Sequence, residues 1–144
     1  MAQNRNLQIL GLAKKAGLLS IGEESAGAAA RSGQAKLVIS ASDASERSVR
    51  NARINAEAGF AAYTAVPYTK FELGNVTGRG SPGTIAFLDT GLAARFLKGL
   101  AETEPESFRK LWEDLNKTTK HADRHAKLTP VSKYTPSGKR RTMQ

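Results

Sequence analysis

The 144-residue chain has the length of one compact domain with a short extension, and 40% of its residues are hydrophobic although only 6% are aromatic. It contains no cysteine, which excludes disulfides, thiolate catalysis and zinc sites with sulfur ligands. The net charge of +9 favours polyanionic partners, with nucleic acid ahead of an anionic membrane surface. Because no apolar run approaches the roughly 20 residues of a membrane span, we expect a cytoplasmic protein without a membrane partner.

Helix and strand patterns alternate along the first 100 residues. Apolar spacing predicts helices at 4–16, 22–32, 45–58, 69–76 and 91–100, and short apolar strands at 18–21, 36–40, 63–67 and 84–88. Gly17, Gly33 and Gly59 stand where helices should end, and either Asp43 or Ser45 would cap the third helix. Strands separated by helices predict an α/β fold, namely a three-layer α/β/α sandwich around a mixed four-stranded sheet.

The composition changes after about residue 101. An acidic-to-basic helix is predicted at roughly 104–120, and residues 116–144 hold eight basic residues against one acid, Asp123. Large aliphatic residues become rare there, so little of this stretch can form a core of its own. We therefore divide the chain into a folded domain at 1–101 and, at 102–144, a C-terminal helix followed by a basic extension that we expect to be partly disordered.

Two patterns resemble ligand sites but lack the context that such sites need. Residues 78–83 spell G-x-G-x-x-G, yet they follow a predicted helix and precede a strand, whereas a dinucleotide loop follows a strand and opens a helix. A flexible loop, or a backbone that approaches RNA closely with Arg79 on a phosphate, explains them better. His121 and His125 would lie one helical turn apart, but no third metal ligand is evident, which favours solvated or phosphate-facing histidines.

Residue types that support catalysis are also missing from the predicted domain. Residues 1–102 contain no histidine, so a serine–histidine–carboxylate triad cannot form there. Glu23 and Glu24 could exchange protons, but carboxylates at a helix start are ordinarily explained by the helix dipole. The sequence therefore predicts a non-enzymatic protein that needs no cofactor and no metal.

Basic residues gather near the ends of predicted elements. Lys14 and Lys15 end the first helix, Lys36 begins a strand, and Arg47, Arg50 and Arg53 follow one helix face. Each alone would be an ordinary solvated side chain, but together they favour RNA phosphates as ligands. The extension adds Tyr134 for base stacking among Lys133, Lys139, Arg140 and Arg141.

Several short motifs stand in an order that resembles a known family. They are residues 10–17 (LGLAKKAG), 22–24 (GEE), 31–39 (RSGQAKLVI), 41–45 (ASDAS), 73–74 (LG), Gly78 and 84–91 (TIAFLDTG). This order is similar to the ribosomal protein family of type L-seven-Ae and L-thirty-e, and most similar to its bacterial, ribosomal-protein-like members, over about residues 5–100. The resemblance implies an α/β/α sandwich that recognises kinked RNA, typically kink-turns, with ribosomal RNA as the expected partner and a monomeric free protein.

The resemblance also implies a binding surface made of residues 22–28, 41–45 and 79–83. Together with the basic residues, the positions expected to contact RNA are Lys14, Lys15, Gly22, Glu23, Glu24, Ser25, Ala28, Lys36, Ser42, Asp43, Ala44, Arg79, Gly80, Ser81, Pro82, Lys139, Arg140 and Arg141.

Some of these positions depart from the family pattern. Glu24, Ser25 and Ala28 stand where kink-turn binders carry Asn-Glu-x-x-Lys, and Ser81 replaces an apolar residue before the proline. A carboxylate at position 24 can accept hydrogen bonds from guanine N1–H and N2–H₂ but cannot donate. These changes keep two other interpretations open: a protein–protein interaction module of the same fold with weak or non-specific RNA binding, and an accessory domain that binds substrate for a separate RNA-modifying enzyme.

Overall fold

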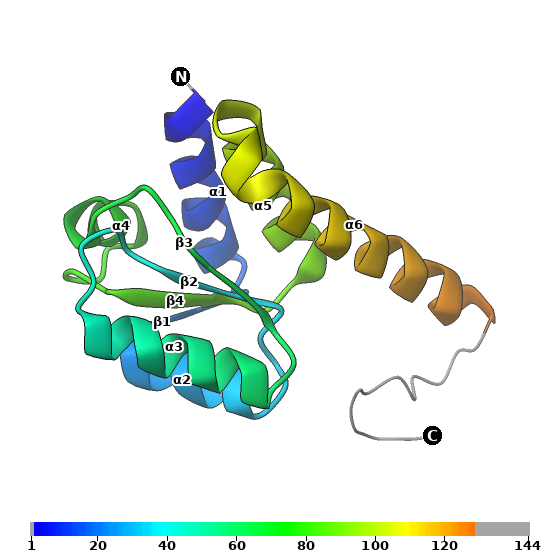
Figure 1. The fold of residues 1–144 in the computed structure, drawn as a ribbon, viewed down its shortest axis with the longest axis horizontal. Coiled ribbons are helices and arrows are strands. Elements are labelled where there is room, and N and C mark those ends of the chain that lie inside the picture. Colours follow the sequence, from blue (N-terminus) through cyan, green and yellow to red (C-terminus); the bar gives the residue numbers. More distant parts are fainter. Residues whose placement is uncertain (1, 129–144) are drawn as a thin grey trace.

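A computed structural model describes residues 2–128 of the chain, and the side chains of residues 5–117. In these residues the elements are α1 (Ala2–Lys15), β1 (Leu19–Ile21), α2 (Glu23–Arg31), β2 (Leu37–Ser40), α3 (Glu46–Ala58), β3 (Ala62–Ala65), α4 (Lys70–Thr77), β4 (Thr84–Phe87), α5 (Thr90–Thr103) and α6 (Pro105–Leu128) (Figure 1). Every helix and strand predicted from the sequence is present, in the predicted order.

The four strands form one mixed sheet in the order β1-β4-β2-β3. β4 is antiparallel to both of its neighbours, whereas β2 and β3 are parallel. The register pairs Ile21 with Ile85 and Ser40 with Thr84, so the ends of β1 and β2 flank the beginning of β4. β2 and β4 are buried along their whole length, which explains why their sequences are apolar apart from Ser40 and Thr84.

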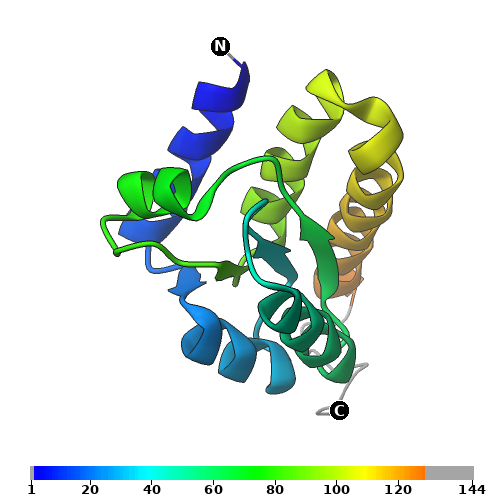
Figure 2. The ribbon, with the colours of Figure 1, turned by 60° about the vertical axis from the view of Figure 1, so that its left-hand side comes forward.

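Helices cover both faces of the sheet (Figures 1 and 2). α2 and α3 lie on one face, and α1, α4 and α5 lie on the other. The layer beneath α2 and α3 is built from small side chains, including Ala26, Ala30 and Ala56, against Val38 and Ala86. The opposite layer holds the larger side chains, with the Phe87 and Phe96 rings 5.1 Å apart. The predicted α/β/α sandwich with a mixed four-stranded sheet is therefore confirmed.

Polar side chains fix where the helices begin. Ser45 caps α3 by accepting a hydrogen bond from the backbone N–H of Ser48, and Thr69 and Glu72 form a reciprocal capping box at α4. Of the two caps considered for α3, Ser45 is the one used. Asp43 instead accepts a hydrogen bond from the backbone of Lys70, at the start of another helix.

α6 is longer at its C-terminal end than the predicted 104–120 and continues to Leu128. Its sequence contains no proline or glycine between Glu106 and Leu128, so nothing breaks the backbone hydrogen-bond pattern at residue 120. Phe108 and Leu115 of α6 are buried in the main core, beside α5. The helix that follows residue 101 thus contributes to the same core as the preceding residues.

Candidate nucleic-acid interface

Three segments that are distant in sequence meet at one end of the sheet. The backbone N–H of Gly22 donates to the carbonyl of Thr84 at 2.9 Å, and the N–H of Ala41 donates to the carbonyl of Gly83 at 2.9 Å. The start of α2 and the loop after β2 therefore lie on either side of the loop before β4. We call residues 22–28, 41–45 and 79–83 together the cradle. These are the three segments named from the sequence, and the structure brings them together.

The first segment of the cradle is the start of α2. Gly22 has φ 102° and ψ 154°, a conformation that favours glycine, and no side chain caps the helix. The backbone N–H groups of the first turn are therefore without a side-chain acceptor. Glu24, Ser25 and Ala28 are exposed, because the opposite face of α2 packs on the sheet through alanines.

The second segment, residues 41–45, is held by the connection between β3 and α4. The backbone N–H of Ser42 donates to the carbonyl of Tyr68 at 2.8 Å, and an Asp43 carboxylate oxygen accepts from the N–H of Lys70 at 2.8 Å. Ser42 and Asp43 are themselves exposed, while Ala44 is half-buried. A loop anchored twice by hydrogen bonds presents its side chains from a fixed backbone.

The third segment runs back along α4. A Cβ added to Gly74 would overlap the carbonyl oxygen of Gly80, and one added to Gly83 would lie 3.7 Å from Cδ of Lys70. Gly78 ends α4 with φ 71°, the left-handed conformation that glycine adopts easily. Within this G-x-G-x-x-G sequence, Gly78 thus serves helix termination, while the close approach to the loop requires the preceding Gly74. The loop follows a helix and precedes a strand, as predicted.

In the third segment, Arg79, Gly80 and Ser81 are exposed, whereas Pro82 is buried.

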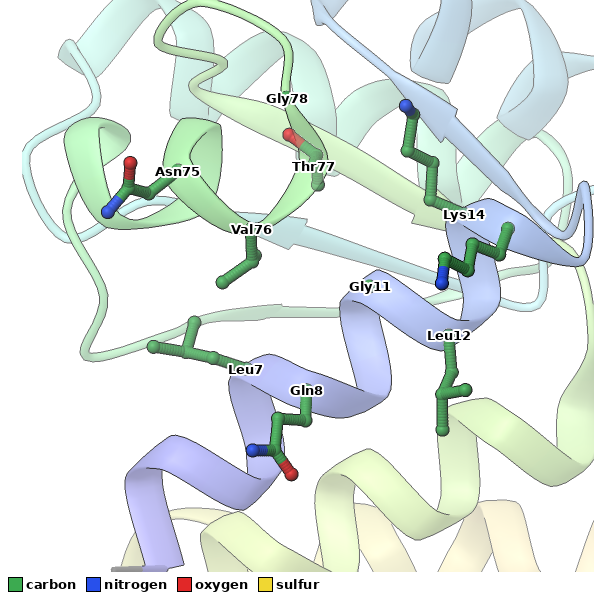
Figure 3. Close-up of a pocket in the computed structure, with 10 residues that line it drawn as sticks. Leu7, Gln8, Gly11, Leu12, Lys14, Asn75, Val76, Thr77 and Gly78 are labelled. Carbon is green, nitrogen blue, oxygen red and sulfur yellow. The ribbon is translucent and has the colours of Figure 1, made fainter.

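Lys14 and Lys15 lie beside the third segment, at the end of α1. An open groove of about 690 Å³ separates α1 from α4, and Leu7 and Val76 point toward each other across it (Figure 3). Lys14 reaches toward Gly78, where an added Cβ would lie 3.9 Å from its Nζ. The ten lining residues are Leu7, Gln8, Gly11, Leu12, Lys14, Lys15, Asn75, Val76, Thr77 and Gly78, and none of them is acidic. The groove therefore has a positive rim that continues into the loop carrying Arg79.

Other predicted contacts are not brought to the cradle. Lys36 precedes β2, and its N–H bonds to the carbonyl of Phe87, so it lies at the opposite end of the sheet. Arg53 lies over the ring of Tyr63, with Cζ 5.5 Å from the ring centroid. Lys139, Arg140, Arg141 and Tyr134 fall outside the described residues.

Sequence reasoning missed the start of α4 as part of this region. Lys70 contacts both the second and the third segments, through Asp43 and Gly83. A signal for it existed: a strand, a helix and a further strand normally form a right-handed unit with parallel strands. The end of β3 must then lie beside the end of β2, which brings residues 66–70 to the cradle.

Neither a metal centre nor a membrane-spanning helix is found in the described part of the chain. No group of three or more histidine, aspartate or glutamate residues is suitably placed to hold a metal ion there. No helix among residues 2–128 combines the length and apolarity needed to cross a bilayer. Residues 121 and 125 lie on α6, four positions apart as predicted, but their side chains are outside the described set.

Comparisons with known proteins support the fold. No protein-family model matches the chain, and neither does any curated protein. Among solved structures, a protein of unknown function from Bacillus halodurans is 28% identical, with a TM-score of 0.59 over 65% of this chain and 94% of that one. A 15.5 kD RNA-binding protein from Giardia lamblia is 17% identical, with a TM-score of 0.55 over 72% and 88% of the two chains. The chain thus shares its fold with a protein that binds RNA.

Proposed function

We propose that this chain is a non-catalytic RNA-binding protein that holds a structured RNA in the cradle. The observation that carries the proposal is the meeting of three partly exposed segments, one of which includes Arg79, at one end of the sheet and next to Lys14 and Lys15. Uncapped backbone N–H groups, hydroxyls, a carboxylate and cations are the groups that proteins use to contact RNA bases and phosphates. The RNA-binding neighbour of the same fold supports the same conclusion.

The chemistry of the cradle suits an RNA whose bases are accessible at a bend or bulge. The edges of paired bases lie deep in the A-form major groove, so sequence-specific contacts are made mainly to loops, bulges and ends. At the start of α2, Glu24 can accept hydrogen bonds from a guanine edge while free backbone N–H groups donate. Arg79 on the neighbouring loop can bind a phosphate.

We further propose that the RNA is a kink-turn or a similarly bent site, that the partner is ribosomal RNA, and that the free protein is a cytoplasmic monomer. The motif order that resembles the L-seven-Ae and L-thirty-e family supports this assignment. Because Glu24, Ser25 and Ala28 replace the usual residues on α2, we expect the preferred RNA to differ in the bases beside the bend.

Electrostatics should supply much of the affinity. The chain carries 22 Lys and Arg residues against 13 Asp and Glu residues. Phosphate binding releases counterions, so the logarithm of the affinity should fall steeply with the logarithm of the salt concentration. The basic residues of the extension, including Lys139, Arg140 and Arg141, should contribute to this slope.

Filter binding of the purified full-length chain tests the proposal. The probes are a kink-turn RNA, fragmented ribosomal RNA and a fully paired duplex of equal length, measured at moderate salt. We expect tighter binding to at least one of the first two probes than to the duplex. Equal, weak binding to all three would contradict the proposal and favour a protein-interaction module.

A charge-matched pair of variants examines the proposed guanine contact. Glu24→Ala should weaken binding to the preferred RNA, whereas Glu57→Ala, which removes an exposed carboxylate near the far end of α3, should not weaken it. A Glu24→Ala protein that binds every probe as well as the wild type would show that Glu24 makes no contact with the RNA.

A further inference from the structure

We propose that Phe71 is a stacking platform for an unpaired base of the RNA held in the cradle. The inference rests on the proposed function and extends the binding site onto α4, which the sequence analysis did not include. It concerns one exposed aromatic side chain and its position relative to the third segment of the cradle.

Exposure makes Phe71 unusual among the aromatic residues. Tyr68, Phe87, Phe96 and Phe108 are buried in the core, but Phe71 is 70% exposed. A side chain so exposed contributes little to the core, which leaves its ring accessible to a ligand. In the described part of the chain, Phe60, at 80%, is the other phenylalanine that is largely exposed.

The position of Phe71 follows from its neighbours on α4. Phe71, Gly74 and Gly78 are at positions i, i+3 and i+7, which lie on one side of a helix. Gly78 leads into the third segment, and Gly74 packs against the backbone of Gly80. Lys70, the preceding residue, lies beside Gly83. The loop thus passes along the side of α4 that carries Phe71, and this spacing places the residue beside the third segment of the cradle.

This position is also fixed in space. Asp43 binds the backbone N–H at the start of α4, and the Gly74–Gly80 approach leaves no room for the loop to shift against the helix. A backbone held in this way needs little ordering on binding, which favours stacking of the Phe71 ring on a base that has left its helix. The neighbouring cations Lys70 and Arg79 can hold the adjoining phosphates, an arrangement typical of sites for unpaired nucleotides.

Phe60 provides a matched control on the same molecule. It follows α3 and precedes Ala62, whose N–H bonds to the carbonyl of Lys36, so it lies at the end of the sheet opposite to the cradle. Phe60→Ala removes a ring that is at least as exposed as that of Phe71, without touching the proposed site.

The test compares the full-length wild type with Phe71→Ala, Phe71→Leu, Phe71→Trp and Phe60→Ala. Affinity is measured for a kink-turn RNA and for fragmented ribosomal RNA. Fluorescence is recorded from kink-turn RNAs that carry 2-aminopurine at single unpaired positions. We expect Phe71→Ala and Phe71→Leu to weaken binding about tenfold, within the range for loss of one stacked base. Phe71→Trp and Phe60→Ala should bind like the wild type, and the 2-aminopurine quenching seen with the wild type at one position should disappear in Phe71→Ala.

Two results would overturn the inference while leaving the proposed function intact. The first is a Phe71→Ala protein that matches Phe60→Ala in affinity and quenching. The second is full recovery by Phe71→Leu, which would indicate apolar contact without stacking. If the wild type binds neither probe, the proposed function fails first and this inference falls with it. Because the ring is exposed, melting temperatures of all variants should agree, which separates lost binding from lost folding.

Discussion

The carboxylate of Asp43 accepts a hydrogen bond of 2.8 Å from the backbone N–H of Lys70, which lies 27 residues later in the chain. Lys70 is the first residue of α4, so the negative charge also faces the positive end of that helix. This contact joins the loop after β2 to the helix that supports the loop before β4. Two of the three cradle segments are therefore positioned together by one side chain.

Removing this carboxylate should loosen the cradle. Asp43→Ala should lower the free energy of unfolding by about 1 kcal/mol, as for the loss of a helix cap, and should weaken RNA binding. Asp43→Asn keeps an acceptor oxygen and should retain most of both properties. Urea denaturation of the three proteins measures the effect, and equal midpoints for Asp43→Ala and the wild type would show that the contact does not matter.

The close approach of Gly74 to Gly80 predicts a second effect on the cradle. Gly74→Ala places a methyl group on the Gly80 carbonyl oxygen, so the loop or α4 must move, at a cost of about 1–3 kcal/mol. Gly11→Ala is the matched control, since its added Cβ would meet the Val76 carbonyl oxygen at 3.6 Å, an ordinary contact. There the higher helix propensity of alanine should stabilise the protein by about 0.5–1 kcal/mol.

The melting temperature should therefore fall for Gly74→Ala and rise for Gly11→Ala, relative to the wild type. Only Gly74→Ala should lose RNA affinity. If both variants melt like the wild type, the loop does not pack on α4 as described.

The burial of Tyr68 predicts a dependence of stability on high pH. Burial raises the pKa of its phenol above the ordinary 10.0, and the nearby Asn6 side chain opposes part of this rise. No hydrogen bond of standard geometry reaches the hydroxyl from the described residues. Because the pKa of Tyr68 is higher in the folded state than in the unfolded state, its contribution to stability is complete below about pH 10. This contribution is lost as the pH rises through the folded-state pKa.

Tyr68→Phe removes the titrating group and leaves the ring beside Phe96, whose centroid is 6.3 Å away. The variant should unfold in urea like the wild type at pH 7, within about 1 kcal/mol, and should lose less stability than the wild type between pH 9 and 11.5. Parallel losses in the two proteins over that range would show that Tyr68 does not titrate on unfolding.

Lys14 and Lys15 should act through phosphate contacts beside the cradle. Lys14→Ala and Lys15→Ala should each reduce the slope of log affinity against log salt by about 1, the contribution expected from one phosphate contact. Lys36→Ala removes the same charge at the opposite end of the sheet and should leave the slope unchanged. Equal slopes for Lys14→Ala and Lys36→Ala would contradict the placement of the RNA.

The order of helices and strands could be predicted from the sequence because its signals are local. Buried strands such as 37–40 are continuous apolar runs, and helix ends coincide with Gly17, Gly33 and Gly59. The extent of α6 could not be predicted, since the polar sequence of residues 116–127 gives little apolar periodicity with which to place the end of a helix.

The candidate site was predictable only in part. The family resemblance named three segments, but their meeting point depends on strand order, which local sequence does not encode. For the same reason the sequence alone does not show that Lys36 lies at the end of the sheet opposite to the cradle. Asp43 is a plausible cap for α3 by position, and its actual partner Lys70 becomes evident only once β2 and β3 are known to be parallel.

Ultraviolet crosslinking in cells, followed by mass spectrometry of RNA-modified peptides, shows which residues of the chain contact RNA. We expect crosslinks from the folded domain to fall on Lys14 and Lys15 and within residues 22–28, 41–45 and 70–83, on a single class of structured RNA. Crosslinks confined to the opposite end of the sheet, around Lys36 and Phe60, would contradict this expectation, as would a protein recovered without RNA.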